Sequence, residues 1–367
     1  MTDWVIVTVK CLAVLFMVLQ VSALLLWVER KGSALIQNRI GANRAAIFGI
    51  GPVNLGFLNT LIADPVKMFT KEDFVPAGAD RVIHQLAPFL ALFPALVTFA
   101  AIPFGDTVEI AGRTVELQAV RLDVGMLYVV AMVAMGVYGV VLAGWASNNR
   151  WALLGSVRGS AQMISYEVAL GLALVSMVLT YDTLDLQQMV RSQGELTLGF
   201  LPAWGIFFQP VAAVIVFTSG MAESKRTPFD LPEAESELIA GYFTEYSGGK
   251  QAAFMLADFA EIVVVSGLMT TLFFGGWQVP YLTSAGWKLP GLDLLPVAGW
   301  LVTLLQVGAF TVKVLFFCWL QILIKWTVPR FRYDQLMNLG WKGMIPVALL
   351  NLLITAGLVL LLAEGEA

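Results

Sequence analysis

The sequence predicts an all-α integral membrane protein with about eight transmembrane helices and a further amphipathic helix on the cytoplasmic surface. Of its 367 residues, 58% are hydrophobic and only 13% are charged, whereas about a quarter of the residues in an average soluble domain are charged. Apolar stretches of about twenty residues, each long enough to cross roughly 30 Å of hydrocarbon, recur along the whole chain. Too few polar side chains remain to cover a soluble surface.

The expected spans follow one another through a single membrane domain, residues 1–367. They cover residues 4–28, 83–104, 125–147, 161–180, 204–222, 254–277, 296–325 and 343–363. No cationic segment precedes the first span and no small-residue cleavage site follows it, so we expect a retained helix and not a signal peptide.

Residues 52–70 are apolar but differ from a plain span, because polar residues including Asp64 and Lys67 interrupt them. Apolar residues recur there at helical spacing: Leu55, Leu58, Ile62, Val66 and Phe69. We therefore expect an amphipathic helix lying along the cytoplasmic interface. A ninth span is the alternative, which Asp64–Pro65 disfavours.

Two loop patterns predict local structure and orientation. Residues 106–124 alternate polar and apolar around Ala111–Gly112, which predicts a short β-hairpin. Lys and Arg concentrate in the odd-numbered loops, while the even-numbered loops hold little beyond Arg113, Arg121, Arg191 and Lys288. Because basic residues are retained on the cytoplasmic side, we expect the odd-numbered loops in the cytoplasm and both termini outside a bacterial inner membrane.

Histidine and cysteine are too scarce for the usual redox centres. Cys11 and Cys318 lie inside apolar spans, and His84 is the only histidine. The chain therefore lacks the ligands for a haem, an iron–sulfur cluster or a zinc site, and we expect it to bind no metal. Any redox role requires a diffusible substrate or a cofactor in another chain.

Several charged residues lie inside the expected spans, where each costs at least about 2.5–3.5 kcal/mol on insertion scales and usually faces a cavity or a partner. Glu167 is about two turns into the fourth span, too deep for a short carboxylate to reach the interface, so we expect a polar cavity there. Asp258 and Glu261 open the sixth span. Lys10 and Lys313 either face such a partner or reach the interface along their own stems.

The fifth loop, residues 222–250, is the densest charged segment. Its acidic residues are Glu223, Asp230, Glu233, Glu235, Glu237 and Glu245. Apolar and aromatic residues separate them, so we expect the loop to fold back against protein, although a solvated face is the usual fate of such a run. Pro232–Glu233 suits the first turn of a helix, which would stack Glu233 and Glu237. Carboxylates at close range raise one another's pKa toward neutrality, as a proton relay requires.

Four polar motifs in the odd-numbered loops carry a resemblance to a known family. They are ERK (29–31) with QNRIGANR (37–44), GWASNNRWALLGSVRGSAQMISYE (144–167), PFDLPEAESELIAGYFTEYSG (228–248) and VPRFRYDQLMNLGWK (328–342). From about residue 25 to residue 345 the chain resembles the NuoH family, a membrane component of bacterial respiratory complex I, the proton-translocating NADH-quinone oxidoreductase.

The resemblance implies a membrane subunit that links the peripheral redox arm of that enzyme to its proton-pumping membrane arm. Quinone is then the substrate, bound together with the peripheral quinone-site subunits. NADH, flavin and the iron–sulfur clusters belong to partner subunits, so this chain holds no bound cofactor and no redox centre of its own. The other partners are the membrane-arm subunits and the lipid bilayer, and no nucleic acid is expected.

The resemblance also assigns roles to particular residues, none of them catalytic in the strict sense. The implied proton path consists of Glu167, Glu223, Asp230, Glu233, Glu235, Glu245 and Asp258. The implied quinone-chamber residues are Arg30, Gln37, Arg39, Arg330, Arg332 and Asp334. Reducing a quinone consumes two protons, and a row of coupled carboxylates could respond by shifting its protonation as a group.

Some residues depart from the family pattern. Ala42 stands where the family usually has proline, which frees the backbone φ at that position. The family's AETNR reads Ala-Glu-Ser-Lys-Arg at residues 222–226, with the acid and the arginine retained. An equivalent membrane protein of a hydrogenase-type or other non-NADH complex is the main alternative. A secondary transporter is disfavoured because no internal repeat is visible.

Overall fold

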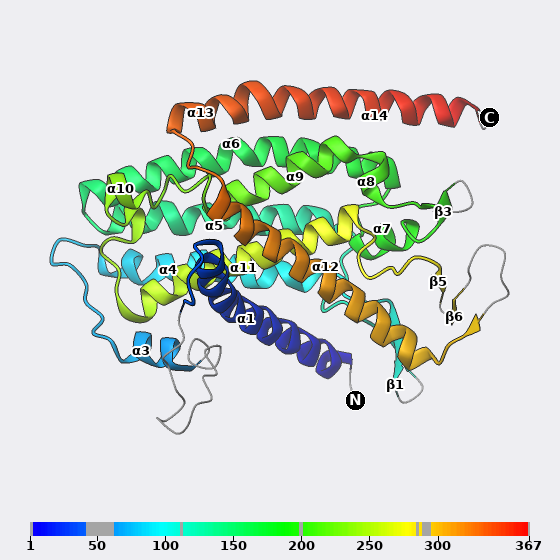
Figure 1. Cartoon of the computed structure of the whole chain (residues 1–367), viewed down its shortest axis with the longest axis horizontal. Helices are drawn as coiled ribbons and strands as arrows, with labels where there is room; N and C mark the ends of the chain where they lie inside the picture. Colours follow the sequence, from blue (N-terminus) through cyan, green and yellow to red (C-terminus); the bar gives the residue numbers. More distant parts are fainter. Residues whose placement is uncertain are drawn as a thin grey trace.

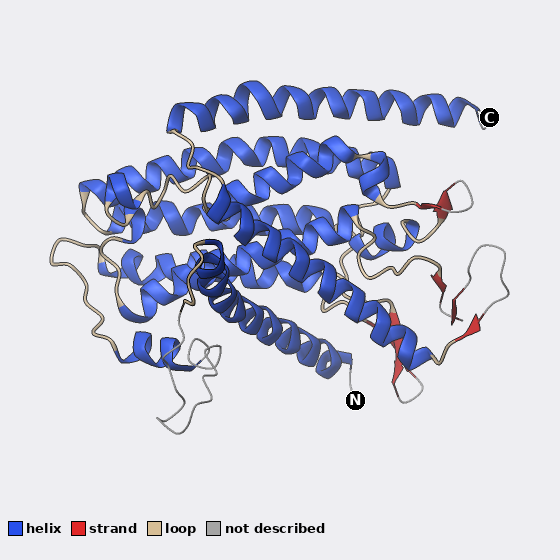
Figure 2. Ribbon diagram, in the orientation of Figure 1, coloured by secondary structure: helices blue, strands red, loops and turns tan. Residues whose placement is uncertain are grey.

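Helices make up most of the part of the chain that the structure describes, and short strands lie mainly toward one end (Figures 1 and 2). The computed structural model describes residues 3–41, 62–110, 113–197, 201–283, 286–287 and 295–365. Within these ranges, seven helical segments are long and apolar enough to cross a membrane. The chain is an all-α integral membrane protein, as its sequence predicts.

The long helices are α1 (Asp3–Ile36), α4 (Arg81–Thr98), α5 (Gly125–Ala146), α6 (Arg150–Tyr181), α11 (Gly248–Phe273), α12 (Gly299–Thr327) and α14 (Ile345–Gly365). Shorter helical elements extend or connect them: α3 (Asp64–Thr70), η2 (Phe99–Ala101), α7 (Leu186–Ser192), α8 (Gly205–Phe208), α9 (Pro210–Glu223), α10 (Glu235–Leu238), η3 (Gly241–Phe243), α13 (Tyr333–Asn338) and η4 (Leu339–Met344). Antiparallel pairing joins β1 (Thr107–Ile110) to β2 (Arg113–Glu116), β3 (Leu196–Thr197) to β4 (Leu201–Pro202), and β6 (Gly286–Trp287) to both β5 (Leu282–Thr283) and β7 (Leu295–Pro296).

The segment expected as the fifth span, residues 204–222, is interrupted. Helix α8 ends at Phe208 and α9 begins at Pro210, with Gln209 between them at φ −131° and ψ 55°. Proline lacks a backbone N–H and disfavours a helical conformation in the residue before it, which accounts for the break. Helix α9 is therefore a half-length apolar helix of 14 residues.

Helices α1 and α6 run well past the spans expected from hydropathy. Helix α6 begins at Arg150, where the Asn149 side chain accepts a hydrogen bond from the backbone N–H of Trp151. Its 32 residues correspond to roughly 48 Å, against roughly 30 Å of hydrocarbon. Helix α1 likewise continues through Glu29 and Arg30 to Ile36. The polar motifs beside these spans are therefore carried on rigid helix.

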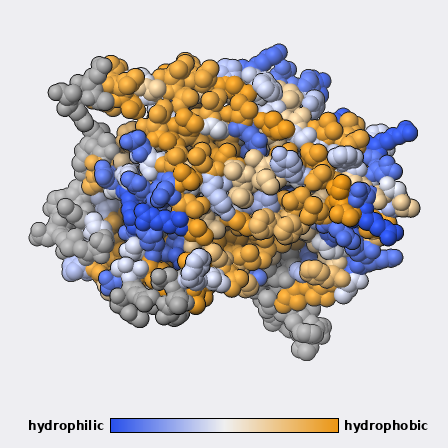
Figure 3. Space-filling model, turned by 180° about the vertical axis from the view of Figure 1, so that it is seen from behind, coloured by the Kyte–Doolittle hydropathy of each residue, from blue (hydrophilic) through white to orange (hydrophobic). Residues whose placement is uncertain are grey.

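Helix α11 lies at the centre of the bundle, and α14 lies along one edge (Figure 1). Helix α11 contacts α4, α12, α1 and α9, whereas α14 packs mainly on α6. A buried polar group fixes α14 to the α8–α9 break. The Gln209 amide donates to Thr355 Oγ1 at 2.8 Å, and the Asn351 amide donates to Gln209 Oε1 at 2.9 Å. Figure 3 shows a broad apolar surface with hydrophilic patches toward its ends.

The hairpin predicted within residues 106–124 is confirmed: β1 and β2 pair antiparallel, with Val108 opposite Val115. Of the expected interfacial helix, residues 52–61 lie outside the described ranges. The remainder contains the short helix α3, whose Val66 and Phe69 side chains are exposed and which packs against α11.

Candidate functional site

Charged side chains gather where α9 ends, against the middle of α11. Lys225 follows α9 in a left-handed backbone conformation (φ 53°), and its side chain is 2% exposed. Its Nζ lies 3.1 Å from Asp258 Oδ1 and 3.0 Å from Glu261 Oε2. Because these two carboxylates are one turn apart on α11, a single lysine reaches both.

The buried lysine stays charged. Burial alone would lower the pKa of Lys225, but the carboxylates of Glu261 and Asp258 outweigh that effect and hold the pKa above its usual value. One cation therefore faces two carboxylates in a buried site.

Two further groups of opposite charges border this one. Glu29 of α1 accepts from Arg226 and from Lys325 of α12, each at 2.5 Å. The Arg226 guanidinium also lies 4.0 Å from the centre of the Phe259 ring. Four elements of the chain thus meet around Arg226: α1, the fifth loop, α11 and α12.

In the second of these groups, Arg330 of the seventh loop donates to Asp230 Oδ2 at 2.7 Å. The backbone N–H of Phe331 donates to the carbonyl oxygen of Pro228 at 3.2 Å, so the seventh loop is fixed to the fifth. Burial raises the pKa of Asp230, although Arg330 opposes the rise.

Glu233 lies near this group, but the helix predicted to begin at Pro232 does not form. Ala234 adopts a left-handed conformation (φ 32°, ψ 59°), so α10 starts only at Glu235. The predicted stacking of Glu233 on Glu237 is therefore wrong. Glu237 turns outward and binds Arg158 at 2.8 Å with its side chain 54% exposed.

The carboxylates close to Glu233 are Asp258 and Asp230, and not Glu237 as predicted. Burial raises the pKa of Glu233 to about 8, and the negative charges of Asp258 and Asp230 add to the rise. Of the remaining predicted acid, Glu235, the structure describes the backbone at the start of α10, and its side chain lies outside what is described.

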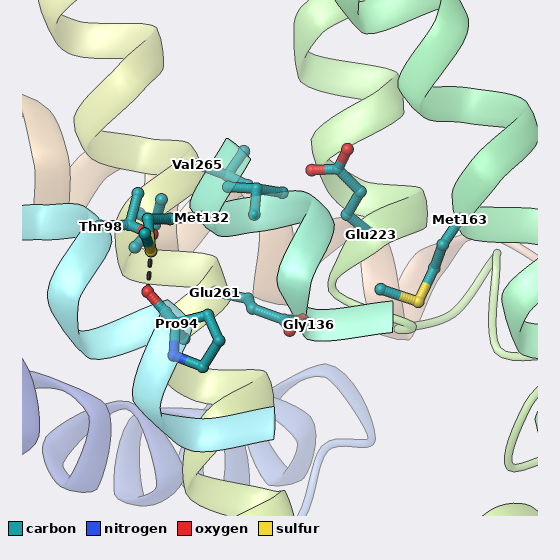
Figure 4. A pocket seen from close by; sticks show the side chains of 11 residues that line it. Pro94, Thr98, Met132, Gly136, Met163, Glu223, Glu261 and Val265 are labelled. Carbon is teal, nitrogen blue, oxygen red and sulfur yellow. Dashed lines mark hydrogen bonds between the residues drawn. The ribbon is translucent and has the colours of Figure 1, made fainter. Parts of the chain in front are cut away.

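Deeper in the bundle, Glu223 and Glu261 line a cavity of about 20 Å³ between α4, α5, α6, α9 and α11. The remaining lining is mostly apolar and includes Met132, Met163 and Val265 (Figure 4). Such a volume holds about one water molecule. Glu223 is 4% exposed, and its Oε1 has no hydrogen-bond partner in the described part of the chain.

Glu167 of α6 is close enough to interact electrostatically with Glu223, as is Glu261. One oxygen of Glu167 is also buried without a hydrogen-bond partner among the described residues. The structure thus places Glu167 within electrostatic reach of Glu223.

Glu245 belongs to a separate group beside the starts of α4 and α6. Its Oε1 accepts from the Asn149 amide at 2.6 Å, and its backbone carbonyl lies 3.3 Å from His84 Nε2. The direct contacts of Glu245 are therefore with the ends of α4 and α6.

Known proteins resemble this chain over nearly its whole length. The sequence profile of the NADH dehydrogenase family matches residues 9–356. One of the NADH-quinone oxidoreductase H subunits of Geobacter sulfurreducens is 46% identical over 346 residues, 94% of each chain. An H subunit of the same enzyme from Cytophaga hutchinsonii is 43% identical over 335 residues, 91% of each chain. The chain belongs to the NuoH family, the H subunits of NADH-quinone oxidoreductase.

Membership of the NuoH family makes this chain a membrane component of an enzyme complex, as the loop motifs predict, with other subunits of that complex as its partners. The relative from Protochlamydia amoebophila, 44% identical over 335 residues, is also an H subunit of NADH-quinone oxidoreductase. In the ranges that the structure covers, His, Cys, Asp and Glu form no group of three arranged to hold a metal ion.

The residues that the NuoH resemblance assigns to quinone lie in three places. Arg30 binds Asp64 beside α3 at 2.7 Å. Gln37 and Arg39 bind each other at 2.7 Å in the exposed turn after α1. Arg330 is drawn into the carboxylate group by Asp230, as described above.

Arg332 and Asp334 are the remaining pair from the seventh loop. They lie 3.2 Å apart with side chains 75% and 62% exposed. In the isolated chain, five of the six assigned residues, all but Arg330, thus have exposed side chains.

Several important members of the site were not predicted from the sequence. Lys225 and Arg226 were expected only as basic loop residues, and Glu29 only as part of a motif. Glu261 was noted but not assigned, although its spacing from Asp258 places both on one helix face. That spacing, with a lysine two residues after Glu223, is the signal that could have found the central ion pairs.

The two lysines inside spans have a local structural role. Lys313 donates to the backbone carbonyls of Phe274, Gly276 and Gln278 at 2.8–3.0 Å. Lys10 donates to the carbonyls of Glu116 and Gln118, and so holds the outer hairpin to α1.

Proposed function

We propose that this chain, as part of NADH-quinone oxidoreductase, contributes to the quinone site and couples quinone reduction to proton translocation. One observation carries the proposal: carboxylates are buried next to one another from the seventh-loop contact inward to α6, and several have an oxygen without a hydrogen bond among the described residues. Buried ionisable groups in a membrane protein are costly to keep and mark proton or ion paths.

The first half of the path is a set of neighbouring charges. Asp230 binds Arg330 and interacts electrostatically with Glu233, which in turn interacts with Asp258. A change of charge near Arg330, such as transient negative charge on a quinone, would weaken its hold on Asp230. Glu233 then responds, because a carboxyl whose pKa is about 8 exchanges its proton close to neutral pH.

The second half runs through Lys225 to the interior. Lys225 binds both Asp258 and Glu261. When one of these carboxylates gains a proton, its attraction for the lysine weakens, and the lysine then binds the other carboxylate more strongly. Glu261 faces the cavity that Glu223 also lines, and one water there could connect the two carboxyl groups. Glu223 lies beside Glu167, which extends the path into α6.

The quinone part of the proposal rests on the surface around the first and seventh loops. Arg39, Arg332 and Asp334 are exposed in the isolated chain, as expected of residues that a peripheral subunit covers on assembly. With the basic loops on the cytoplasmic side, this surface faces the peripheral arm, where electrons arrive.

A Glu223→Gln variant tests the proton path. Glutamine keeps the volume of the side chain but cannot act as a proton-exchanging acid. We expect quinone-linked proton pumping in membrane vesicles to fall by about 10²-fold, the lower end of what a positioned acid or base contributes. NADH oxidation by an artificial acceptor that bypasses quinone should not change.

Glu195→Gln is the matched control, because Glu195 is an exposed carboxylate in the fourth loop. If the assembled Glu223→Gln complex pumps as well as this control, the proposed proton path is wrong.

Arg330→Ala tests the quinone side. Removing the guanidinium frees Asp230 and takes a positive charge from the surface, so we expect a higher quinone KM before any loss of assembled complex. An unchanged KM and an unchanged quinone-linked rate would exclude Arg330 from the quinone site.

A further inference from the structure

An open polar cleft lies at the end of the bundle where α5 ends and α6 begins. Its volume is about 360 Å³, and its lining includes Ser147, Asn148, Asn149 and the carboxylate of Glu245. Glu245 is half-buried and fixed by the Asn149 amide, so its carboxyl group lies at the wall of the cleft. Bulk water can therefore reach this carboxylate, which accepts from a neutral amide in a cleft that the guanidinium-bearing Arg150 also lines.

Behind Glu245 lies the only histidine of the chain. His84 is fully buried, and its ring stacks on Tyr246 with centroids 4.0 Å apart and an interplanar angle of 4°. With Nε2 facing the Glu245 carbonyl at 3.3 Å, Nδ1 is buried and has no hydrogen-bond partner among the described residues. A buried ring nitrogen with a free lone pair is an available proton acceptor.

The charges that face His84 come from three elements. They are Glu245 of the fifth loop, Asp73 of the segment before α4 and Lys250 of α11. Lys250 is itself bound to Asp73 at 3.0 Å. Two carboxylates and one ammonium thus surround the ring, whose burial opposes a lasting positive charge.

Tyr242 links the His84–Tyr246 pair to the carboxylates in the interior of the bundle. Tyr242 and Tyr246 pack edge-on against the same Phe254 ring, with centroids 5.3 and 5.0 Å from it. The Tyr242 hydroxyl is buried without a hydrogen-bond partner in the described ranges. Burial raises its pKa, and the charges of Asp258 and Glu233 add to the rise, so this hydroxyl lies near the inner carboxylates. A neutral hydroxyl can pass a proton by accepting one and donating another.

We propose that Glu245 and His84 form a proton-uptake site, which takes protons from water in the cleft and supplies the inner carboxylates past Tyr242. This inference rests on the proposed function and adds an entry point for its protons, separate from the contact of Arg330 with Asp230. In each transfer, one excess proton carried by the water of the cleft binds the Glu245 carboxylate. Nδ1 of the buried His84 ring then accepts that proton and releases it toward Tyr242, with no change in oxidation state.

The experiment uses the assembled complex in membrane vesicles with two variants. Glu245→Gln keeps the bond from Asn149, and His84→Phe keeps an aromatic ring on Tyr246. For both we expect quinone-linked turnover to fall more steeply with rising pH than in the unaltered complex. The limit is about tenfold per pH unit, because uptake without a local acid follows the free proton concentration.

Glu237→Gln is the control, since that carboxylate belongs to the same loop but is exposed and paired with Arg158. A third variant, His84→Ala, leaves space for a small base. Added imidazole should restore its turnover at high pH, a recovery that a purely structural role of His84 does not predict.

The outcomes separate the two proposals. If Glu223→Gln abolishes pumping while Glu245→Gln and His84→Phe keep the pH profile of the Glu237→Gln control, the uptake site is wrong and the proton path stands. If Glu223→Gln pumps normally, the proton path itself is wrong. Absence of rescue by imidazole, together with a pH-independent loss of rate in His84→Phe, would reduce His84 to a packing residue.

Discussion

Lys225 and Lys313 are both withdrawn from water, yet their surroundings differ in kind. Lys313 is surrounded by three backbone carbonyls and lies 4.8 Å from the centre of the Trp204 ring. Lys225 lies between two carboxylates. A carbonyl oxygen does not take up a proton at ordinary pH, so the acceptors in the first arrangement have a single protonation state. The second has several, because either carboxylate can be protonated.

The difference separates a lysine that stabilises the fold from a lysine that can take part in proton transfer. The three bonds of Lys313 close the turn after α11, whereas Lys225 binds the middle of that helix. The end of α11 is thus fixed by a lysine with all three donors used, and its middle holds charges that can be redistributed. Four substitutions test this comparison.

Lys225→Met should have the largest effect. It leaves Asp258 and Glu261 buried without a cation, and breaking a buried ion pair on one side typically costs about 3–5 kcal/mol. We expect little assembled complex, measured as the amount of this chain recovered with its partner subunits. A complex that assembles and pumps normally would mean that the lysine is dispensable.

Lys313→Met should have the next largest effect, and of a different kind. Three carbonyls lose their donor, at about 1–3 kcal/mol for a buried group left unsatisfied. We expect a lower Tm of the complex and an unchanged number of protons pumped per electron. A reduced proton ratio would show that Lys313 also belongs to the proton path, and the comparison would fail.

Glu233→Gln should change the pH dependence of stability. The pKa of Glu233 is raised to about 8 in the folded chain from an ordinary value of 4.5. The folded state therefore binds this proton more tightly, and the stability that it contributes is complete below about pH 4.5 and lost as the pH rises through about 8. Glutamine removes this loss.

The Tm of the Glu233→Gln complex, relative to that of the unaltered complex, should therefore rise between weakly acidic and alkaline pH. Two parallel Tm curves over that interval would contradict the raised pKa of Glu233.

Glu237→Gln should have the smallest effect. Its ion pair with Arg158 is exposed, and such pairs contribute about 0.2–1 kcal/mol. We expect Tm and proton pumping close to those of the unaltered complex at moderate salt. A large loss of pumping would mean that this carboxylate belongs with the buried set after all.

Much of the fold follows from the sequence, because hydrophobic stretches of membrane length are a direct physical signal. The signal is poor at helix ends. Residues 150–160 of α6 contain Arg150, Arg158 and several small residues, so hydropathy places them in a loop although they are helical. Pro210 is a signal for the break at Gln209, yet the span expected from hydropathy passes straight through it.

The site was less predictable from the sequence, because it depends on which side chains the backbone turns toward the interior. A lysine two residues beyond α9 normally indicates a solvent-facing loop, and only the left-handed turn at Lys225 directs it inward. The left-handed Ala234 could not be foreseen, because alanine has no preference for that conformation. It determines that Glu233 points inward and Glu237 outward.

The amide of Gln209 has a consequence for biosynthesis. Helices enter the bilayer in the order of their synthesis, so α9 is inserted before α14 exists. Until α14 arrives, the Gln209 side chain lacks Asn351 and Thr355, and hydrogen bonds of this kind between membrane helices contribute about 0.6 kcal/mol each on average. The Gln209 side chain, still without these partners, thus favours the later docking of α14. A nascent chain stopped short of α14 would present this side chain to lipid, or to the quality-control machinery that recognises unassembled membrane proteins.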